Sequence, residues 1–339
     1  MFSVVSIRTQ AAVTDGGTAA INAKLLSKMM PLFREETVEI SSEGQRTSIS
    51  CGKTTYAINC PPARDFPQQE AELANEAAND AAKITGICGI ARKTAPFTGD
   101  ASSKPEMQCV RLKLKGSAVH ATASDCAKIM LVKGSGESSA ELELLLPGRT
   151  LGMLAQVSED SDMFDVALDG NQIIFDRRDM TFTARKTYAG AYMDTDGIIK
   201  NMKPAYAAIS ETAKIKEALD LMHVSAQAGR RIKPVNIRLL HGEILMGCDN
   251  DSSEASIAVP ASISSETPEA RFHYDTFALT KLFSLLSGKA NLEIDARGIV
   301  MVRTASEVYM QAPMRMPEAR AAENETENPA GTGGYQEAA

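Results

Sequence analysis

The 339-residue sequence lacks the features that mark several large classes of protein. It has no tryptophan and only 5% aromatic residues, so aliphatic side chains and 16 methionines must fill its core. No apolar run reaches the roughly 18 residues that a membrane-spanning helix needs, and the first residues carry no basic segment of the secretion-signal type. We therefore expect a cytoplasmic protein of two or three domains with no membrane partner.

Motifs of catalysis and metal binding are also missing. The four histidines form no H-E-x-x-H motif, and the six cysteines include no C-x-x-C pair, so the sequence indicates no zinc site. There is no G-x-S-x-G and no arrangement of a nucleophile with its base. We expect no catalytic residue, no metal and no cofactor, and a protein that is not an enzyme. In a reducing compartment the cysteines would be small buried hydrophobic residues.

One triplet, Gly52-Lys53-Thr54, resembles the end of a phosphate-binding loop. That loop needs a glycine five residues before Gly52, where this chain has Thr47. The triplet also lies between two strand-like runs, whereas a phosphate loop joins a strand to a helix. The sequence therefore predicts a hairpin turn.

An internal repeat with a period of about 125 to 130 residues is present instead. Strand-like segments begin at Val38, Val166 and Leu292, with offsets of 128 and 126 residues. Each follows a short apolar helix candidate and precedes two further alternating segments. The recurrence predicts one helix-plus-strands unit used three times.

A second repeated element occurs twice, at an offset of 125 residues. Alternation of apolar and polar residues predicts a half-buried hairpin over 110–124 and another over 235–249. A helix candidate precedes each hairpin, over 82–93 and 213–228. The full unit is thus a helix with paired strands, a linker, and a second helix with paired strands, and two copies of it are complete.

These repeats predict the domain organisation. The first copy is a half copy, and its spacing implies that roughly fifty residues of a full unit would precede it. The tail is rich in Pro, Glu, Asn and Gly and is expected to be disordered. The expected parts are a partial first domain (1–67), a linker (68–83), a second domain (84–200), a linker (201–212), a third domain (213–316) and a tail (317–339).

Positive formal charge is concentrated in the helix candidates. The chain has a net charge of −7, but five helix candidates together carry +12, which leaves −19 on the rest. Lys and Arg are good helix formers on wet faces, which explains part of this excess but not the scarcity of Glu. Helices on one face would form a basic surface that contacts phosphates without recognising sequence. The predicted DNA-contacting residues are Lys24, Lys28, Arg34, Lys83, Arg92, Lys93, Arg149, Lys214, Arg230, Arg231, Lys281 and Lys289.

Several segments, in their order and spacing, resemble one protein family. They are LPGRTL at 146–151, DGNQIIF at 169–175, DMTFTAR at 179–185, APMRM at 312–316 and ARDFP at 63–67. Over nearly all of 1–316 the chain resembles the bacterial DNA polymerase III beta subunit, the DNA sliding clamp. The resemblance implies an α+β DNA clamp fold, with repeated helix-plus-antiparallel-sheet domains, helices on the inner face and sheets outside.

The same resemblance implies a function. Family members form a ring, usually a head-to-tail homodimer, around duplex DNA in the cytoplasm, at the nucleoid. They act as processivity factors that tether DNA polymerase and are opened by a clamp loader, without a cofactor. The alternative is a clamp-like interaction module that binds partner peptides and does not close a ring on DNA.

The resemblance also implies two protein-binding sites. The hydrophobic pocket for partner peptides maps onto Met107, Ser124, Lys128, Ile129, Met193, Ile198, Phe277, Met310, Pro313 and Met314. The dimer interface maps onto Tyr56, Ile58, Met222, His223 and Val224. Two departures from the family affect the pocket: the segment 124–129 lacks the family's Gly, His and Arg, and the tail extends beside it. A hypothesis is that the tail shields the pocket.

Overall fold

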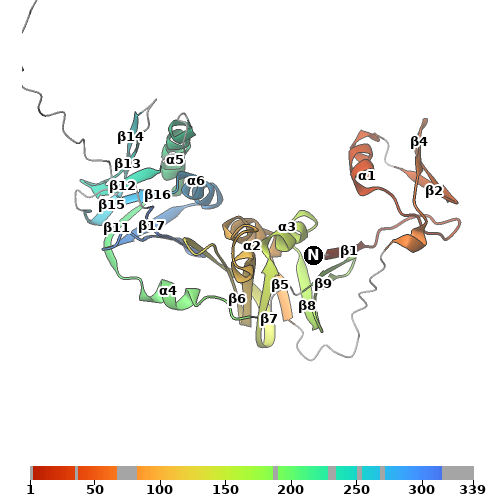
Figure 1. The fold of residues 1–339 in the computed structure, drawn as a ribbon, viewed down its shortest axis with the longest axis horizontal. Helices are drawn as coiled ribbons and strands as arrows, with labels where there is room; N and C mark the ends of the chain where they lie inside the picture. Colours follow the sequence, from red (N-terminus) through yellow and green to blue (C-terminus); the bar gives the residue numbers. More distant parts are fainter. Residues whose placement is uncertain are drawn as a thin grey trace, which may run out of the picture.

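The chain folds into an arc of three units (Figure 1). The computed structural model describes residues 3–34, 37–66, 82–185, 190–227, 234–249, 254–267 and 272–314. Residues 68–81 of the predicted linker (68–83) and the tail at 317–339 lie outside these ranges, as do Arg230 and Arg231. Among the described residues, no helix is long and apolar enough to cross a membrane.

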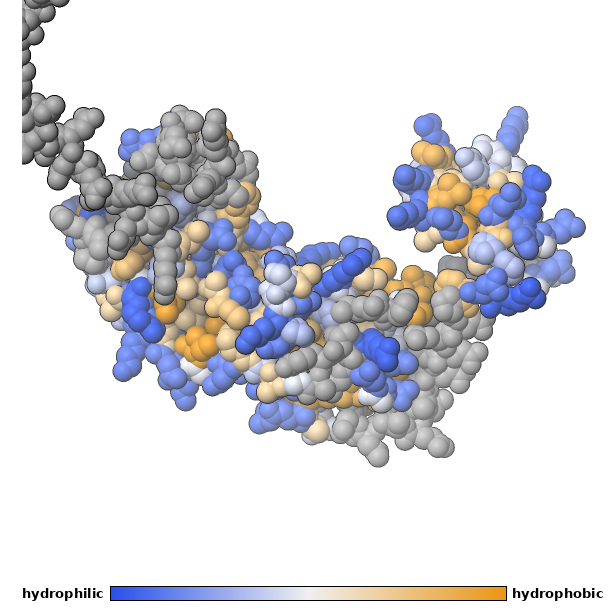
Figure 2. Space-filling model, in the orientation of Figure 1, coloured by the Kyte–Doolittle hydropathy of each residue, from blue (hydrophilic) through white to orange (hydrophobic). Residues whose placement is uncertain are grey.

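The first unit is small and has a core of its own. Its elements are β1 (Ser3–Ile7), α1 (Ala23–Met29), η1 (Met30–Leu32), β2 (Glu39–Glu43), β3 (Arg46–Cys51), β4 (Thr54–Asn59) and η2 (Ala63–Asp65). Helix α1 begins at Asn22, whose side chain accepts a hydrogen bond from the Leu25 amide at 3.1 Å. Met29 of α1 packs on Ile49 and Ile58 of the β2–β3–β4 sheet, where Figure 2 shows hydrophobic residues ringed by hydrophilic ones.

The hairpin turn predicted at Gly52 is confirmed. Strands β3 and β4 pair in antiparallel fashion from Cys51 opposite Thr54. Gly52 has φ of 56°, a left-handed conformation that glycine adopts without steric cost.

The second unit begins with a short strand and is built around one long hairpin. Its elements are β5 (Ala82–Thr85), α2 (Ile87–Thr94), η4 (Ala95–Phe97), η5 (Pro105–Gln108), β6 (Cys109–Ser124), β7 (Lys128–Pro147), α3 (Gly148–Gln156), β8 (Met163–Asp169), β9 (Gln172–Arg177) and β10 (Met180–Arg185). Helices α2 and α3 pack side by side over the sheet.

The third unit repeats this plan after a connecting helix. Its elements are α4 (Thr195–Asn201), β11 (Pro204–Glu211), α5 (Thr212–Gln227), β12 (Val235–Leu240), β13 (Glu243–Asp249), β14 (Glu254–Pro260), β15 (Ser262–Ser265), β16 (Phe272–Tyr274), α6 (Thr276–Leu285), β17 (Lys289–Asp295), β18 (Val300–Arg303) and β19 (Glu307–Gln311). Helices α5 and α6 pack side by side, as α2 and α3 do.

A single twelve-stranded sheet links the three units. Strand β1 of the first unit pairs with β10 of the second, and β7 of the second unit pairs with β19 of the third. Two smaller sheets, β2–β3–β4 and β14–β13–β12–β16, belong to the first and third units. Main-chain hydrogen bonds therefore cross both junctions, although among the described residues the first unit joins the large sheet through β1 alone.

The repeated helix and strands are confirmed in all three units. Helices α1, α3 and α6 precede strands β2, β8 and β17, and each of these strands is followed by two more. The hairpin predicted over 235–249 is also present, as β12 and β13.

Three details of the sequence interpretation were wrong. Residues 110–124 form no hairpin, because β6 pairs along its whole length with the twenty-residue β7 and only shifts register at Gly116. The helix predicted over 82–93 starts later: Ala82 and Ile84 alternate inward on β5, and Gly86, with φ of 70°, separates that strand from α2. Most of the segment 201–212, predicted as a linker, is strand β11 of the large sheet.

The six cysteines were expected to be buried. Cys126 is exposed and the others are buried.

Candidate nucleic-acid and peptide interfaces

Five helices lie along the concave side of the arc. Figure 1 shows α1, α2, α3, α5 and α6 on that side and the large sheet on the other, with α4 at the convex edge. Several predicted DNA-contacting cations are exposed on these helices or directly after them and form no ion pair within the described part of the chain. They are Lys24, Lys28, Arg34, Arg149, Lys214 and Lys281.

Two of the predicted cations lie on strands, which corrects the sequence interpretation. Lys83 lies on β5 and pairs with Asp165 at 4.0 Å. Lys289 lies on β17 and pairs with Glu211 at 3.8 Å. Helix α2 begins after Lys83 and α6 ends before Lys289, so both side chains belong to the large sheet.

Two cations on α2 have carboxylate partners from elsewhere in the chain. Arg92 lies 3.6 Å from Asp160. Lys93 donates a hydrogen bond to Glu307, whose side chain is 8% exposed, at the junction with the third unit. Burial alone would raise the pKa of Glu307, but hydrogen bonds from Lys93 and Thr304 outweigh it and hold that pKa below its usual value. Lys93 therefore joins two units and is a poor candidate for DNA contact.

A hollow of about 480 Å³ lies where the second and third units meet. Its apolar floor belongs to a cluster that also contains Ile129 and Leu131 of β7. Three of the predicted pocket residues line it: Met193, Ile198 and Met310. The full lining is Met193, Asp194, Gly197, Ile198, Asn201, Met202, Arg297, Ile299 and Met310.

Buried side chains hold α4, which forms one wall of the hollow. The Asp194 side chain caps the helix by accepting from the Gly197 amide at 2.9 Å. Arg111 of β6 is buried and donates to Asp196 at 2.9 Å and to Thr195 at 3.0 Å. Its guanidinium also lies 5.3 Å from the centre of the Tyr192 ring, a cation–π contact.

Two predicted pocket residues on the β6–β7 hairpin support the hollow without lining it. Ile129 pairs with Met310 across the junction and is buried beneath the floor. Lys128 binds Asp125 at 2.8 Å and Asp275 at 3.4 Å. Burial alone would lower the pKa of Lys128, but these two carboxylates outweigh it and raise that pKa. Lys128 thus fastens the hairpin to the start of α6.

The other predicted pocket residues lie elsewhere. Ser124 is buried and accepts a hydrogen bond from the Cys126 amide, and Met107 is buried in η5. Phe277 packs edge-on against His223, with 4.3 Å between ring centres, so it belongs to the α5–α6 surface. The last two, Pro313 and Met314, follow β19 and are absent from the lining.

Several lining residues were missed by sequence reasoning. Asn201 and Met202 lie three and four residues after the predicted pocket residue Ile198, so helical spacing could have found them. Arg297 and Ile299 come from the turn between β17 and β18, which only the tertiary fold brings to α4.

Some residues predicted for the dimer interface are exposed and others are buried. Tyr56 lies on the edge strand β4 and Val224 on α5, and both are exposed. Ile58 packs in the core of the first unit and Met222 in the core of the third, so their side chains are not available as surface contacts. Strands β4 and β14 are edges of their sheets among the described residues.

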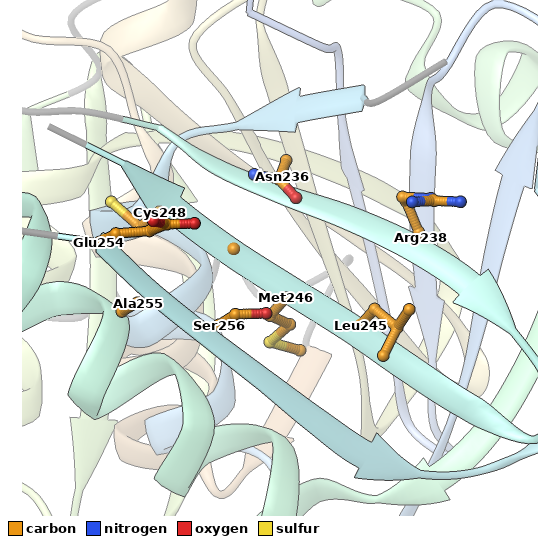
Figure 3. A pocket seen from close by; sticks show the side chains of 9 residues that line it. Asn236, Arg238, Leu245, Met246, Cys248, Glu254, Ala255 and Ser256 are labelled. Carbon is orange, nitrogen blue, oxygen red and sulfur yellow. The ribbon is translucent and has the colours of Figure 1, made fainter. Parts of the chain in front are cut away.

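A second, smaller hollow of about 150 Å³ lies on the β14–β13–β12–β16 sheet (Figure 3). Asn236 and Arg238 on β12 and Ser256 on β14 lie on either side of Gly247. A Cβ at Gly247 would lie 2.8 Å from the Asn236 amide nitrogen, so the glycine leaves room for the Asn236 side chain.

Comparison with known proteins identifies similar chains. No family profile matches this chain. The beta sliding clamp of Streptomyces coelicolor is 21% identical over 303 residues, which are 84% of this chain and 76% of the relative. That of Halalkalibacterium halodurans is 23% identical over 238 residues, 68% of this chain and 61% of the relative.

Solved structures show the same fold. The DNA polymerase III beta subunit of Thermotoga maritima has a TM-score of 0.80 at 16% identity and covers 93% of this chain and 86% of its own. A putative beta subunit from Eubacterium rectale scores 0.79 at 14% identity, covering 93% and 87%. The sliding clamp of Bacillus subtilis scores 0.73 at 20% identity, covering 87% and 79%.

Repeated helix-plus-sheet units, joined by strand pairing into one large sheet, define an α+β clamp, and the fold class expected from the resemblance is confirmed. By sequence and structure, the chain is a divergent homologue of the bacterial beta sliding clamp. It spans about three quarters of one curated relative and less than two thirds of the other.

Proposed function

We propose that this protein is a DNA sliding clamp that encircles duplex DNA as a head-to-tail homodimer. The observation that carries the proposal is the segregation of elements: the helices bearing unpaired cations line the concave side, and the large sheet lies on the other side (Figure 1). Duplex DNA presents regularly spaced phosphates, which such a surface attracts without preferring any register.

The hollow beside α4 supports the second half of this function, the tethering of DNA polymerase and a clamp loader. Its floor is apolar and its rim is polar. Helix α4, which forms one wall of it, lies at the convex edge, away from the concave face that would hold DNA. A short peptide with one large apolar residue fits such a site, because an anchor buried in a well-packed pocket supplies most of the affinity of a small interface.

Retention on circular DNA tests the proposal. A ring held by topology is expected to stay on nicked circular duplex through gel filtration in high salt and to be lost when the circle is cut once. Loading with a clamp loader and ATP precedes the filtration. Absence of retention on the intact circle would contradict encirclement and favour the alternative, a clamp-like module that only binds partner peptides.

The peptide site predicts a large effect for Ile198→Asp. Ile198 lies on α4, is 41% exposed and lines the hollow, so a carboxylate there removes apolar contact area at little cost to the core. We expect the affinity for a leucine-containing polymerase peptide to fall about thirtyfold, the effect of losing a central anchor contact. Fluorescence anisotropy with a labelled peptide measures it.

The matched control is Ile209→Asp. Ile209 is another isoleucine, 48% exposed, on β11 and absent from the lining of the hollow. Its substitution is expected to leave peptide affinity within about twofold. Equal losses in both variants would show that the hollow is not where the peptide binds.

A further inference from the structure

One cation, Arg297, stands among the described residues that line the peptide hollow. We propose that Arg297 determines specificity by selecting partner peptides with an acidic side chain next to the apolar residue that enters the hollow. This inference rests on the proposed peptide-binding function and adds to it the chemistry of the preferred partner.

The buried side chain of Asp295 holds the Arg297 guanidinium in place. Asp295 is buried, with its side chain 6% exposed, while the Arg297 side chain is 75% exposed. The Oδ2 atom of Asp295 accepts from Nε of Arg297 at 3.0 Å and lies 2.9 Å from Nη2. One edge of the guanidinium is therefore fixed, and Nη1 on the other side is left for a ligand.

The turn that carries Arg297 is also rigid. Oδ1 of Asp295 accepts from the backbone amides of Arg297 and Ile299, at 2.9 and 2.8 Å. The buried Tyr274 hydroxyl donates to the Gly298 carbonyl at 2.9 Å. Because the side chain and its turn are already ordered, little further entropy is lost when a ligand binds.

The remaining charges around the hollow limit where an acidic group can bind. Asp194 lies on the α4 wall, and its carboxylate caps that helix. Asp196 is turned toward Arg111 and Lys113, at 2.9 and 3.5 Å. A peptide carboxylate is thus repelled on the α4 side and attracted on the Arg297 side, so the preference must depend on position relative to the anchor.

Peptide pairs test this inference directly. Labelled nonapeptides share a central leucine and carry Asp or Asn on its N-terminal or its C-terminal side. For one of the two positions we expect the Asp peptide to bind about fivefold more tightly than its Asn partner, as an exposed charge pair allows. The ratio is expected to fall toward one in 0.5 M salt, because the pair is solvent-exposed.

Two variants isolate the guanidinium. Arg297→Gln is expected to bring the Asp/Asn ratio to about one while the Asn peptide binds as before. Arg178→Gln removes the same charge from an exposed position between β9 and β10 and is expected to keep the ratio. The ratio is measured within one protein sample, so a partial loss of folded protein does not change it.

The outcomes separate the two proposals. Equal binding of Asp and Asn peptides by the unmodified protein overturns the role of Arg297 and leaves the peptide site intact. An Asp preference that persists in Arg297→Gln also overturns it. Failure of every peptide to bind contradicts the peptide site itself, and this inference falls with it.

Discussion

Replacing five helix cations with glutamine is expected to lower the affinity for duplex DNA by about 10²- to 10⁴-fold at about 0.1 M salt. The five are Lys24, Lys28, Arg149, Lys214 and Lys281, all exposed on helices of the concave side. Each phosphate contact releases counterions, so its loss reduces the slope of log affinity against log salt by about 0.9. Fluorescence anisotropy of a labelled duplex over a salt series gives both quantities.

The control carries the same change of charge elsewhere. Lys53, Lys104, Arg178, Lys200 and Lys203 are exposed and lie off the five concave-side helices. Their replacement by glutamine is expected to leave the salt slope unchanged within about one unit, with a small general loss of affinity. If both quintuple variants lose affinity equally, the affinity for DNA depends on the net charge of the protein and not on the cations of the concave side.

Truncating Arg111 to alanine is expected to destabilise the protein by about 2–3 kcal/mol and to loosen α4. The side chain is 5% exposed and its ion pair with Asp196 joins β6 to α4. Removal leaves a cavity, ends the contact with the Tyr192 ring and frees the helix that walls the peptide hollow. Urea unfolding gives the loss of stability, and hydrogen exchange of the α4 amides reports the loosening.

Two comparison variants make this test specific. Arg111→Met fills the same space without a charge, so its stability is expected to stay closer to that of the unmodified protein, with α4 still loosened. Lys115→Ala breaks an exposed ion pair with Glu141 and is expected to cost less than about 0.5 kcal/mol. If hydrogen exchange of the α4 amides is unchanged in Arg111→Ala, Arg111 does not anchor α4.

Much of the fold could be predicted because the repeat is visible in the periodicity of neighbouring residues. In each unit, apolar residues first recur about every 3.6 residues, which predicts the helices α1, α3 and α6. Apolar and polar residues then alternate, which predicts the strands that follow. The failures also have local causes. Ala82 to Ile84 combines helix-forming residues with a two-residue period, and only pairing with β7 and β8 makes it a strand. Residues 110–124 form one strand because a long partner is available to pair with it.

The candidate sites were less predictable, because side chains distant in sequence determine them. Lys93 appears free in the sequence, but Glu307, 214 positions away, binds it. Phe277 was expected at the pocket, yet its contact with His223 places it on the α5–α6 surface. The turn with Arg297 reaches the hollow only through the packing of β17 and β18 beside α4.

The sequence by itself determined the repeated unit, the positive charge of the helices and the resemblance to clamps, since propensity, periodicity and charge are properties of neighbouring residues. The tertiary structure alone decided which cations remain unpaired and which apolar residues line a hollow. Both depend on the pairing of β7 with β19 and on the docking of α4 through Arg111. These contacts join residues far apart in the chain, and no local pattern encodes them.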